Sequence, residues 1–154
     1  MNNVLTHGSL NIIISKIRSD HKKLVFTNGC FDIIHPGHIH VLSKAKLLGD
    51  ILVVGLNSDK SVKKLKGKER PFVNESDRSK ILLSLKYVDH VIIFDELTPR
   101  DIIEKIKPDI LVKGGDYKVN DIVGSKFVKD SGGRVEIVKF LEGYSSSNYI
   151  DNIN

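Results

Sequence analysis

The sequence has a single cysteine, Cys30, and no apolar run that approaches the roughly 20 residues needed to span a bilayer. One cysteine excludes a framework of intramolecular disulfides and fits a reducing compartment. The first residues, Met1 to Val4, lack the basic region and apolar core of a signal peptide. We therefore expect a cytoplasmic protein that does not enter the membrane.

Two widespread nucleotide-binding motifs are also missing. No GxxxxGK[ST] pattern is present, which excludes a P-loop enzyme, and the glycine spacing of a dinucleotide-binding fingerprint does not follow the first apolar run. Internal repeats, low-complexity tracts and linkers are absent as well. With 154 residues, of which 40% are hydrophobic and 28% charged, we expect one domain, residues 1–154, with an N-terminal helix (1–20) packed on it.

Apolar runs and helical patterns alternate along the chain. Strands are expected at 24–27, 50–56, 91–94, 109–112 and 134–138, and helices at 8–20, 37–48, 74–86, 98–106 and 121–131. This alternation is typical of an α/β fold. We expect a Rossmann-like, doubly wound, mostly parallel five-stranded sheet with helices on both faces.

Four turns that follow expected strands have the composition of a binding site. They are residues 29–38, 57–70, 113–117 and 142–147. Ligands bind such sheets beyond the carboxyl ends of the strands, and these ends share one edge. The four turns are therefore expected to form a single site.

The second turn is strongly basic and contributes to the net charge of +5. Its cations are Lys60, Lys63, Lys64, Lys66, Lys68 and Arg70. No aromatic residue is interleaved among them, whereas a single-strand nucleic-acid binder usually has stacking aromatics. A basic loop of this kind suits a small anionic substrate, and a solvated lysine-rich surface is the alternative.

The first turn places His35 and His38 at the start of an expected helix, after Gly29 and around Gly37. A helix N-terminus attracts phosphate through its unpaired N–H groups and partial positive charge. Imidazoles beside it can stabilise charge that develops on a phosphate. Zinc ligation is an alternative, but no cysteine or acidic partner stands at ligand spacing, so no metal ligand is assigned. A structural pair of helix-capping histidines is the other alternative.

Three further positions have two interpretations each. Cys30 is either a nucleophile or a small residue packed in a tight turn, and the packed role is favoured. Asp32 either binds magnesium or holds the turn. The serines at 145–147 either cap a final helix or contact phosphate through its N-terminus.

The first turn resembles the signature of the HxGH nucleotidyltransferase superfamily. The residues that fit its G-x-F-D-x-x-H-x-G-H pattern are Gly29, Phe31, Asp32, His35, Gly37 and His38. Within it, the chain is most similar to heptose-1-phosphate adenylyltransferases, which occur alone or as the C-terminal half of bifunctional ADP-heptose synthases. The segments that carry this likeness are 27–32, 57–59, 65–67, 70–71, 111–117 and 124–126.

This resemblance implies a reaction. A sugar 1-phosphate oxygen attacks the α-phosphorus of ATP in line, ADP-heptose forms and pyrophosphate leaves, without a covalent enzyme intermediate. The partners implied are ATP, a heptose 1-phosphate and Mg²⁺ bound with the triphosphate, with no nucleic acid and no membrane. A homodimer is implied as well. Because the bifunctional relatives carry a sugar kinase upstream, the kinase and a phosphatase of the same pathway are expected to be separate polypeptides.

The resemblance also assigns roles to residues. The catalytic residues would be His35, His38, Lys66 and Arg78, of which Arg78 would hold the β- and γ-phosphates. The helical pattern by itself places Arg78 on the polar side of its helix. The nucleotide would contact Asn28, Gly29, Cys30, Phe31, Gly37, His38, Lys113, Gly114, Gly115, Asp116, Ser145, Ser146 and Ser147. The acceptor would contact Asp32, Asn57, Asp59 and Lys66.

The main alternative is a glycerol-3-phosphate cytidylyltransferase, which shares the fold and the chemistry but uses CTP and a smaller acceptor. The arginine-bearing turn of that group is not matched, since Val138 to Leu141 stands there, and the segment from Lys113 to Tyr117 favours the heptose enzymes. Two other classes are a catalytically silent nucleotide-binding module and a basic nucleic-acid binder with strongly salt-dependent affinity.

Overall fold

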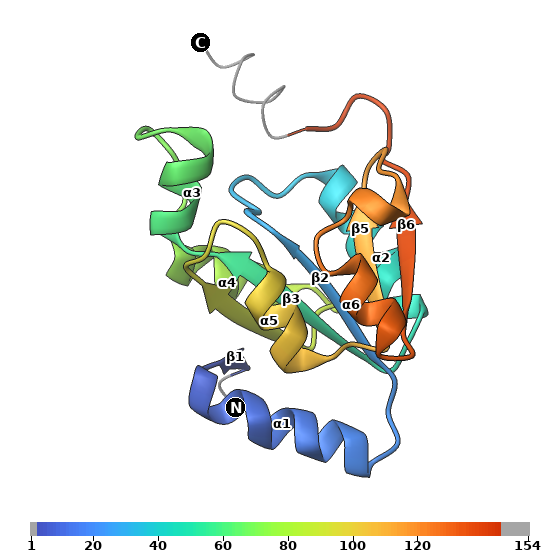
Figure 1. The fold of residues 1–154 in the computed structure, drawn as a ribbon. Helices are drawn as coiled ribbons and strands as arrows, with labels where there is room; N and C mark the ends of the chain where they lie inside the picture. Colours follow the sequence, from blue (N-terminus) through green and yellow to red (C-terminus); the bar gives the residue numbers. More distant parts are fainter. Residues whose placement is uncertain (1–2, 146–154) are drawn as a thin grey trace.

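A computed structural model describes residues 3–145, which contain a six-stranded sheet (Figure 1). The strands are β1 (Val4–Leu5), β2 (Leu24–Gly29), β3 (Ile51–Asn57), β4 (His90–Phe94), β5 (Ile110–Gly114) and β6 (Arg134–Val138). They are all parallel and lie in the order β1-β4-β3-β2-β5-β6. The α/β Rossmann-like fold is thus confirmed, with six strands instead of five.

The strand that sequence analysis missed is β1. It has two residues, Val4 and Leu5, which pair with Val91 and Ile92 at the edge of the sheet. Two residues are too short to show an alternating pattern, so their conformation is determined by pairing with β4 and not by local sequence.

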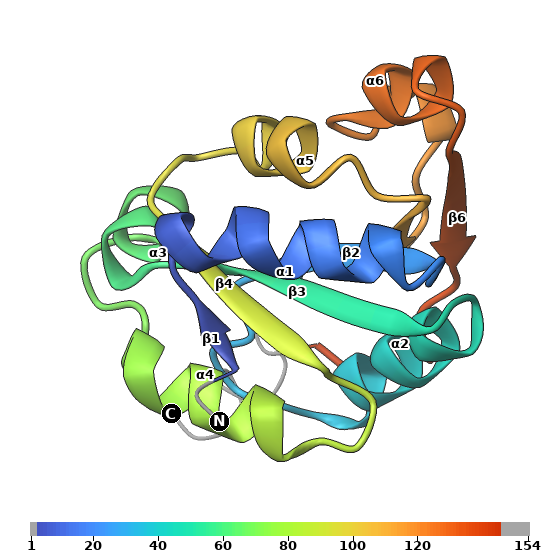
Figure 2. The same cartoon turned by 90° about the horizontal axis from the view of Figure 1, so that it is seen from below.

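Helices cover both faces of the sheet. They are α1 (His7–Ser19), α2 (Pro36–Leu47), α3 (Asp59–Lys66), α4 (Glu75–Ser84), α5 (Arg100–Ile106) and α6 (Ser125–Asp130), with a short 3₁₀ helix, η1 (Val119–Asp121). Figure 2 shows α1 and α5 on one side of the sheet and α2 and α4 on the other. Two apolar clusters correspond to these two layers: Phe26 and Val53 pack with α1, α5 and α6, whereas Val54 and Leu56 pack with α2 and α4.

The lysine-rich segment after β3 was expected to be a loop, but most of it is the helix α3. Ser58 caps this helix by accepting a hydrogen bond from the backbone N–H of Ser61 at 3.1 Å. Only Ser61 and Val62 of its eight residues are buried. The apolar side of this helix consists of Val62 and Leu65 alone, and two apolar residues are too few to show a helical period, which is why the sequence pattern did not reveal it.

The site lies where the sheet changes its winding direction. From the central β2, the chain continues to β3 on one side, and β5 lies on the other. Loops after β2, β3 and β5 therefore diverge from one edge and leave a crevice between them. None of the helices in residues 3–145 has the length and apolar character to cross a bilayer.

Candidate active site

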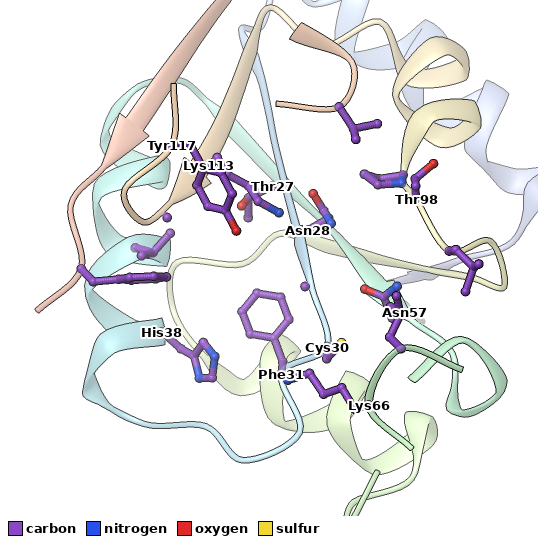
Figure 3. A pocket seen from close by; sticks show the side chains of 18 residues that line it. Thr27, Asn28, Cys30, Phe31, His38, Asn57, Lys66, Thr98, Lys113 and Tyr117 are labelled. Carbon is purple, nitrogen blue, oxygen red and sulfur yellow. The ribbon is translucent and has the colours of Figure 1, made fainter. Parts of the chain in front are cut away.

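A cavity of about 480 Å³ opens at the carboxyl ends of β2, β3 and β5 (Figure 3). It is lined by Thr27, Asn28, Gly29, Cys30, Phe31, His38, Val41, Asn57, Leu65, Lys66, Leu97, Thr98, Pro99, Lys113, Gly114, Tyr117, Val123 and Phe140. Three of the four expected turns contribute to this lining. The fourth approaches from the side, since a Cβ added to Gly37 would lie 3.2 Å from the Cβ of Tyr144.

The two histidines cap α2 and also build one end of the cavity. His35 is the N-cap, and its Nδ1 accepts a hydrogen bond from the backbone N–H of Gly37 at 3.1 Å. His38 reciprocates, because its Nδ1 accepts from the backbone N–H of His35 at 3.4 Å. The rings stack with centroids 3.8 Å apart. His38 lines the cavity, whereas His35 does not. The two histidines thus cap the helix, and this role leaves His38 available to bind phosphate.

The environment keeps His38 neutral. Burial, the neighbouring His35 and then Lys66 lower the pKa of His38 to about 4, and burial also lowers the pKa of His35. A neutral imidazole whose Nδ1 accepts a hydrogen bond carries its proton on Nε2. His38 can therefore offer one N–H donor to an anion in the cavity at neutral pH.

Two lysines supply the positive charge of the cavity. Lys66 ends α3, and Lys113 belongs to β5; Figure 3 shows them on opposite sides of Phe31. Burial lowers the pKa of Lys113, whose Nζ lies 5.6 Å from the centre of the Tyr117 ring. No carboxylate lines the cavity in the part of the chain that the structure describes. The site is thus prepared for negatively charged ligands.

Cys30 lies in the cavity wall as a neutral thiol. Burial raises its pKa, and this effect outweighs the opposing influence of Lys66 and Arg78. A thiolate is the nucleophilic form of cysteine, so a raised pKa disfavours nucleophilic catalysis. The packed role that the sequence favoured agrees with this environment.

Asp32 is turned away from the cavity. Its side chain is completely buried and accepts hydrogen bonds from Arg70 Nε at 2.6 Å and from the backbone N–H groups of Phe72 and Val73 at 2.9 and 3.0 Å. It therefore holds a segment about 40 residues further along the chain, not its own turn. The predicted contact with the acceptor has no geometric support, because Asp32 does not line the cavity.

Arg78 is not on the polar side of its helix, as sequence analysis expected. Its exposure is 1%, and its guanidinium reaches under the ends of β2 and β3. It donates to the carbonyls of Cys30, Asn57 and Val73 at 2.6, 2.7 and 2.8 Å, and to the carboxylate of Asp59 at 2.7 Å. The prediction that Arg78 lies on the polar side of its helix is wrong. Its buried guanidinium donates hydrogen bonds to four acceptors that would otherwise lack these donors. Neither Arg78 nor Asp59 lines the cavity.

The remaining predicted residues divide between the cavity and its surroundings. Those in the lining are Asn28, Gly29, Cys30, Phe31, His38, Asn57, Lys66, Lys113 and Gly114. Gly37, Gly115, Asp116 and Ser145 are described but are not in the lining, and Ser146 and Ser147 lie outside the described residues. Within residues 3–145, no group of three or more His, Cys, Asp and Glu side chains could hold a metal ion.

Sequence reasoning missed several lining residues. Leu97, Thr98 and Pro99 follow β4, so the rule that carboxyl ends share one edge could have included them. Val41 and Phe140 reach the cavity through packing of distant elements, and nothing in their local sequence indicates it. Tyr117 belongs to the expected turn 113–117, although no contact was assigned to it there.

The comparisons with known proteins agree with this geometry. A family model described as cytidylyltransferase-like matches residues 26–152. The chain is 51% identical over 148 residues to the bifunctional protein HldE of Citrifermentans bemidjiense, and 52% identical over 144 residues to that of Helicobacter pylori. Each alignment covers 94% of this chain but 30% of the relative, so the chain spans less than a third of the length of these proteins.

A solved structure extends the likeness to three dimensions. The crystal structure of the lipopolysaccharide core biosynthesis protein from Thermoplasma volcanium is 34% identical to this chain, with a TM-score of 0.63. The match covers 80% of this chain and 99% of that one. The family match begins in β2 and includes His38, Lys66 and Lys113, the imidazole and the two cations that line the cavity. The chain therefore belongs to the cytidylyltransferase-like family of nucleotidyltransferases.

Proposed function

We propose that this chain transfers the adenylyl group of ATP to a heptose 1-phosphate and releases pyrophosphate. The observation that carries the proposal is the charge of the cavity. One neutral imidazole and two lysines line it, and no carboxylate does so among the described residues. Two phosphate-bearing substrates must approach each other during this transfer, and cations on opposite sides of the cavity offset their repulsion. The relationship to the HldE proteins and to a lipopolysaccharide core biosynthesis protein supports the heptose as acceptor.

In this proposal the phosphate oxygen of the sugar attacks the α-phosphorus of ATP directly. A covalent intermediate is not needed, and the neutral thiol of Cys30 is a poor candidate for one. His38 donates its Nε2–H to the phosphate as charge develops, and Lys66, whose charge acts on His38, lies near the same group. Catalysis then consists of positioning and electrostatic stabilisation, as is usual for phosphoryl chemistry.

Mg²⁺ bound with the triphosphate would neutralise part of its charge. Because no carboxylate lines the cavity in residues 3–145, its ligands would be phosphate oxygens and the several waters that this ion usually keeps. The protein would hold the nucleotide and not the metal. The homodimer, the cytoplasmic location and the separate kinase and phosphatase remain predictions.

One assay tests the proposal. Pyrophosphate release is measured with ATP or CTP as donor and with heptose 1-phosphate or glycerol 3-phosphate as acceptor. We expect turnover with ATP and heptose 1-phosphate, and a kcat/KM at least about 10²-fold lower for the other three pairs, as for substrates that leave polar groups of the site unpaired. Turnover with CTP and glycerol 3-phosphate alone would establish the cytidylyltransferase alternative.

A further inference from the structure

We propose that Phe140 is the platform on which the base of the nucleotide stacks. The proposal rests on the proposed function only in requiring that a nucleoside triphosphate binds in the cavity. Phe140 lies two residues beyond the end of β6 and lines the cavity, yet its exposure is 55%. Exposure of an apolar ring to water is unfavourable, so a ring this exposed in the cavity wall is a candidate for contact with a ligand.

Two glycines hold the ring in place. A Cβ added to Gly114 would lie 3.1 Å from Cε1 of Phe140, and one added to Gly115 would lie 2.9 Å from Cε2. The glycines therefore let the ring rest directly on the backbone that follows β5. The backbone N–H of Gly115 also donates to the carbonyl of Val138 at 2.9 Å, which fixes the segment that carries Phe140. One side of the ring is thus supported, while more than half of the residue stays open.

The position of Phe140 relative to the phosphate-binding end suits a base. The Cβ added to Gly114 would also meet Val41 Cγ2 at 2.7 Å, so the ring lies beside Val41. Val41 follows His38 by three residues on α2, which is about one helical turn. The ring therefore lies about one helical turn along α2 from His38, the imidazole to which the proposed function assigns the phosphates.

The other aromatic residues in the lining are less suited to this role. Phe31 is only 7% exposed, and its ring packs on His38 with centroids 5.0 Å apart. Tyr117 lies on Gly115 beside Phe140, but the Nζ of Lys113 lies over its ring. In the part of the chain that the structure describes, Phe140 has no such ring or cation contact. Phe140 is also the most exposed of these three residues, at 55% against 48% for Tyr117 and 7% for Phe31.

The proposal is tested by binding of ATP and of inorganic tripolyphosphate, each measured by calorimetry without an acceptor. Loss of the stacking between a base and an aromatic ring weakens binding by about 10-fold or more. Phe140→Ala should therefore lower the affinity for ATP by that factor and change the affinity for tripolyphosphate by less than about 2-fold. Phe140→Tyr should bind ATP as the wild type does. Leu141→Ala, a neighbouring exposed residue outside the lining, is the matched control and should change neither affinity.

The outcomes separate this proposal from the proposed function. The stacking proposal is refuted if Phe140→Ala binds ATP as tightly as the wild type, or if its affinities for ATP and tripolyphosphate fall by the same factor. Neither result contradicts adenylyl transfer. If the wild type prefers CTP, the same measurements are made with CTP, and a selective loss supports the platform although the proposed donor is wrong. A wild type that binds tripolyphosphate but neither nucleotide would overturn the platform.

Discussion

His38 combines a structural and a chemical role in a single imidazole. Its Nδ1 completes the cap of α2, so Nε2 is the atom left to donate into the cavity. The same hydrogen bond that stabilises the helix start thus fixes the tautomer that the chemistry needs. The burial that lowers the pKa of His38 ensures that it is a neutral donor and not a cation near pH 7.

Removal of this donor should slow catalysis far more than it affects folding. We expect His38→Ala to lower kcat by about 10²-fold or more, as for other groups that stabilise charge only in the transition state. Pyrophosphate release measures the rate, and thermal unfolding followed by circular dichroism checks the fold. His40→Ala, on the same helix but outside the cavity lining, is the control. A near-normal rate in His38→Ala would remove this residue from the mechanism.

The lowered pKa of His38 also makes stability depend on pH. The unfolded chain takes up a proton at this residue near pH 6.5, whereas the folded chain does so only near pH 4. Between these values the unfolded state binds more protons, so the free energy of unfolding falls as pH falls through this range. In His38→Gln this contribution is absent, and urea unfolding from pH 7 to 4 should show a smaller loss of stability than in the wild type. Equal losses in both proteins would contradict the lowered pKa.

At the scale of secondary structure elements, a buried clamp connects the segments around the cavity. Arg78 on α4 joins the ends of β2 and β3, and through Asp59 it joins the start of α3. Asp32 fixes the loop that connects α3 to α4. Lys66 lies between these two anchors, at the end of α3. The position of this lysine in the cavity therefore depends on charged residues that do not enter it.

Replacement of Arg78 distinguishes a clamp from a phosphate ligand. Arg78→Ala would leave three carbonyls and a carboxylate without their donor, so we expect a loss of about 3 kcal/mol or more in the free energy of unfolding. Arg78→Lys keeps the charge but has fewer donors and should lose less. Urea unfolding measures both.

The control for this clamp is Lys80→Ala, because Lys80 lies on the same helix with a side chain 72% exposed. It should change stability by less than about 0.5 kcal/mol, as is usual at exposed positions. If Arg78→Ala folds with wild-type stability and only raises the KM for ATP, the guanidinium contacts phosphate after all.

At the scale of the whole molecule, the polarity of the strands determined what the sequence could predict. Parallel strands place their following turns on one edge, which is why Gly29 and Lys113, more than 80 residues apart, were expected in one site and line one cavity. Strand polarity does not predict where a side chain points when it packs against an element distant in sequence. Arg78 and Phe140 are examples, because their surroundings come from strands distant in sequence.

Because the cavity is formed by turns from several strands, a ligand bound in it should raise the free energy of unfolding of the whole chain. A ligand that contacts the turns after β2, β3 and β5 binds only the folded chain. At a free ATP concentration of 100 times its Kd, the free energy of unfolding should rise by about 2.7 kcal/mol. Lys113→Ala removes a cation from the cavity and should reduce this gain at the same ATP concentration, as urea unfolding can show.

The matched control for Lys113 is Lys64, an exposed lysine of α3 outside the cavity lining. Lys64→Ala changes the net charge of the chain by the same amount and should keep the full gain in stability from ATP. The opposite result, with the gain lost in Lys64→Ala and kept in Lys113→Ala, would place the nucleotide on the surface of α3. Comparison of the two variants thus separates a site formed by the whole sheet edge from non-specific attraction to a basic helix.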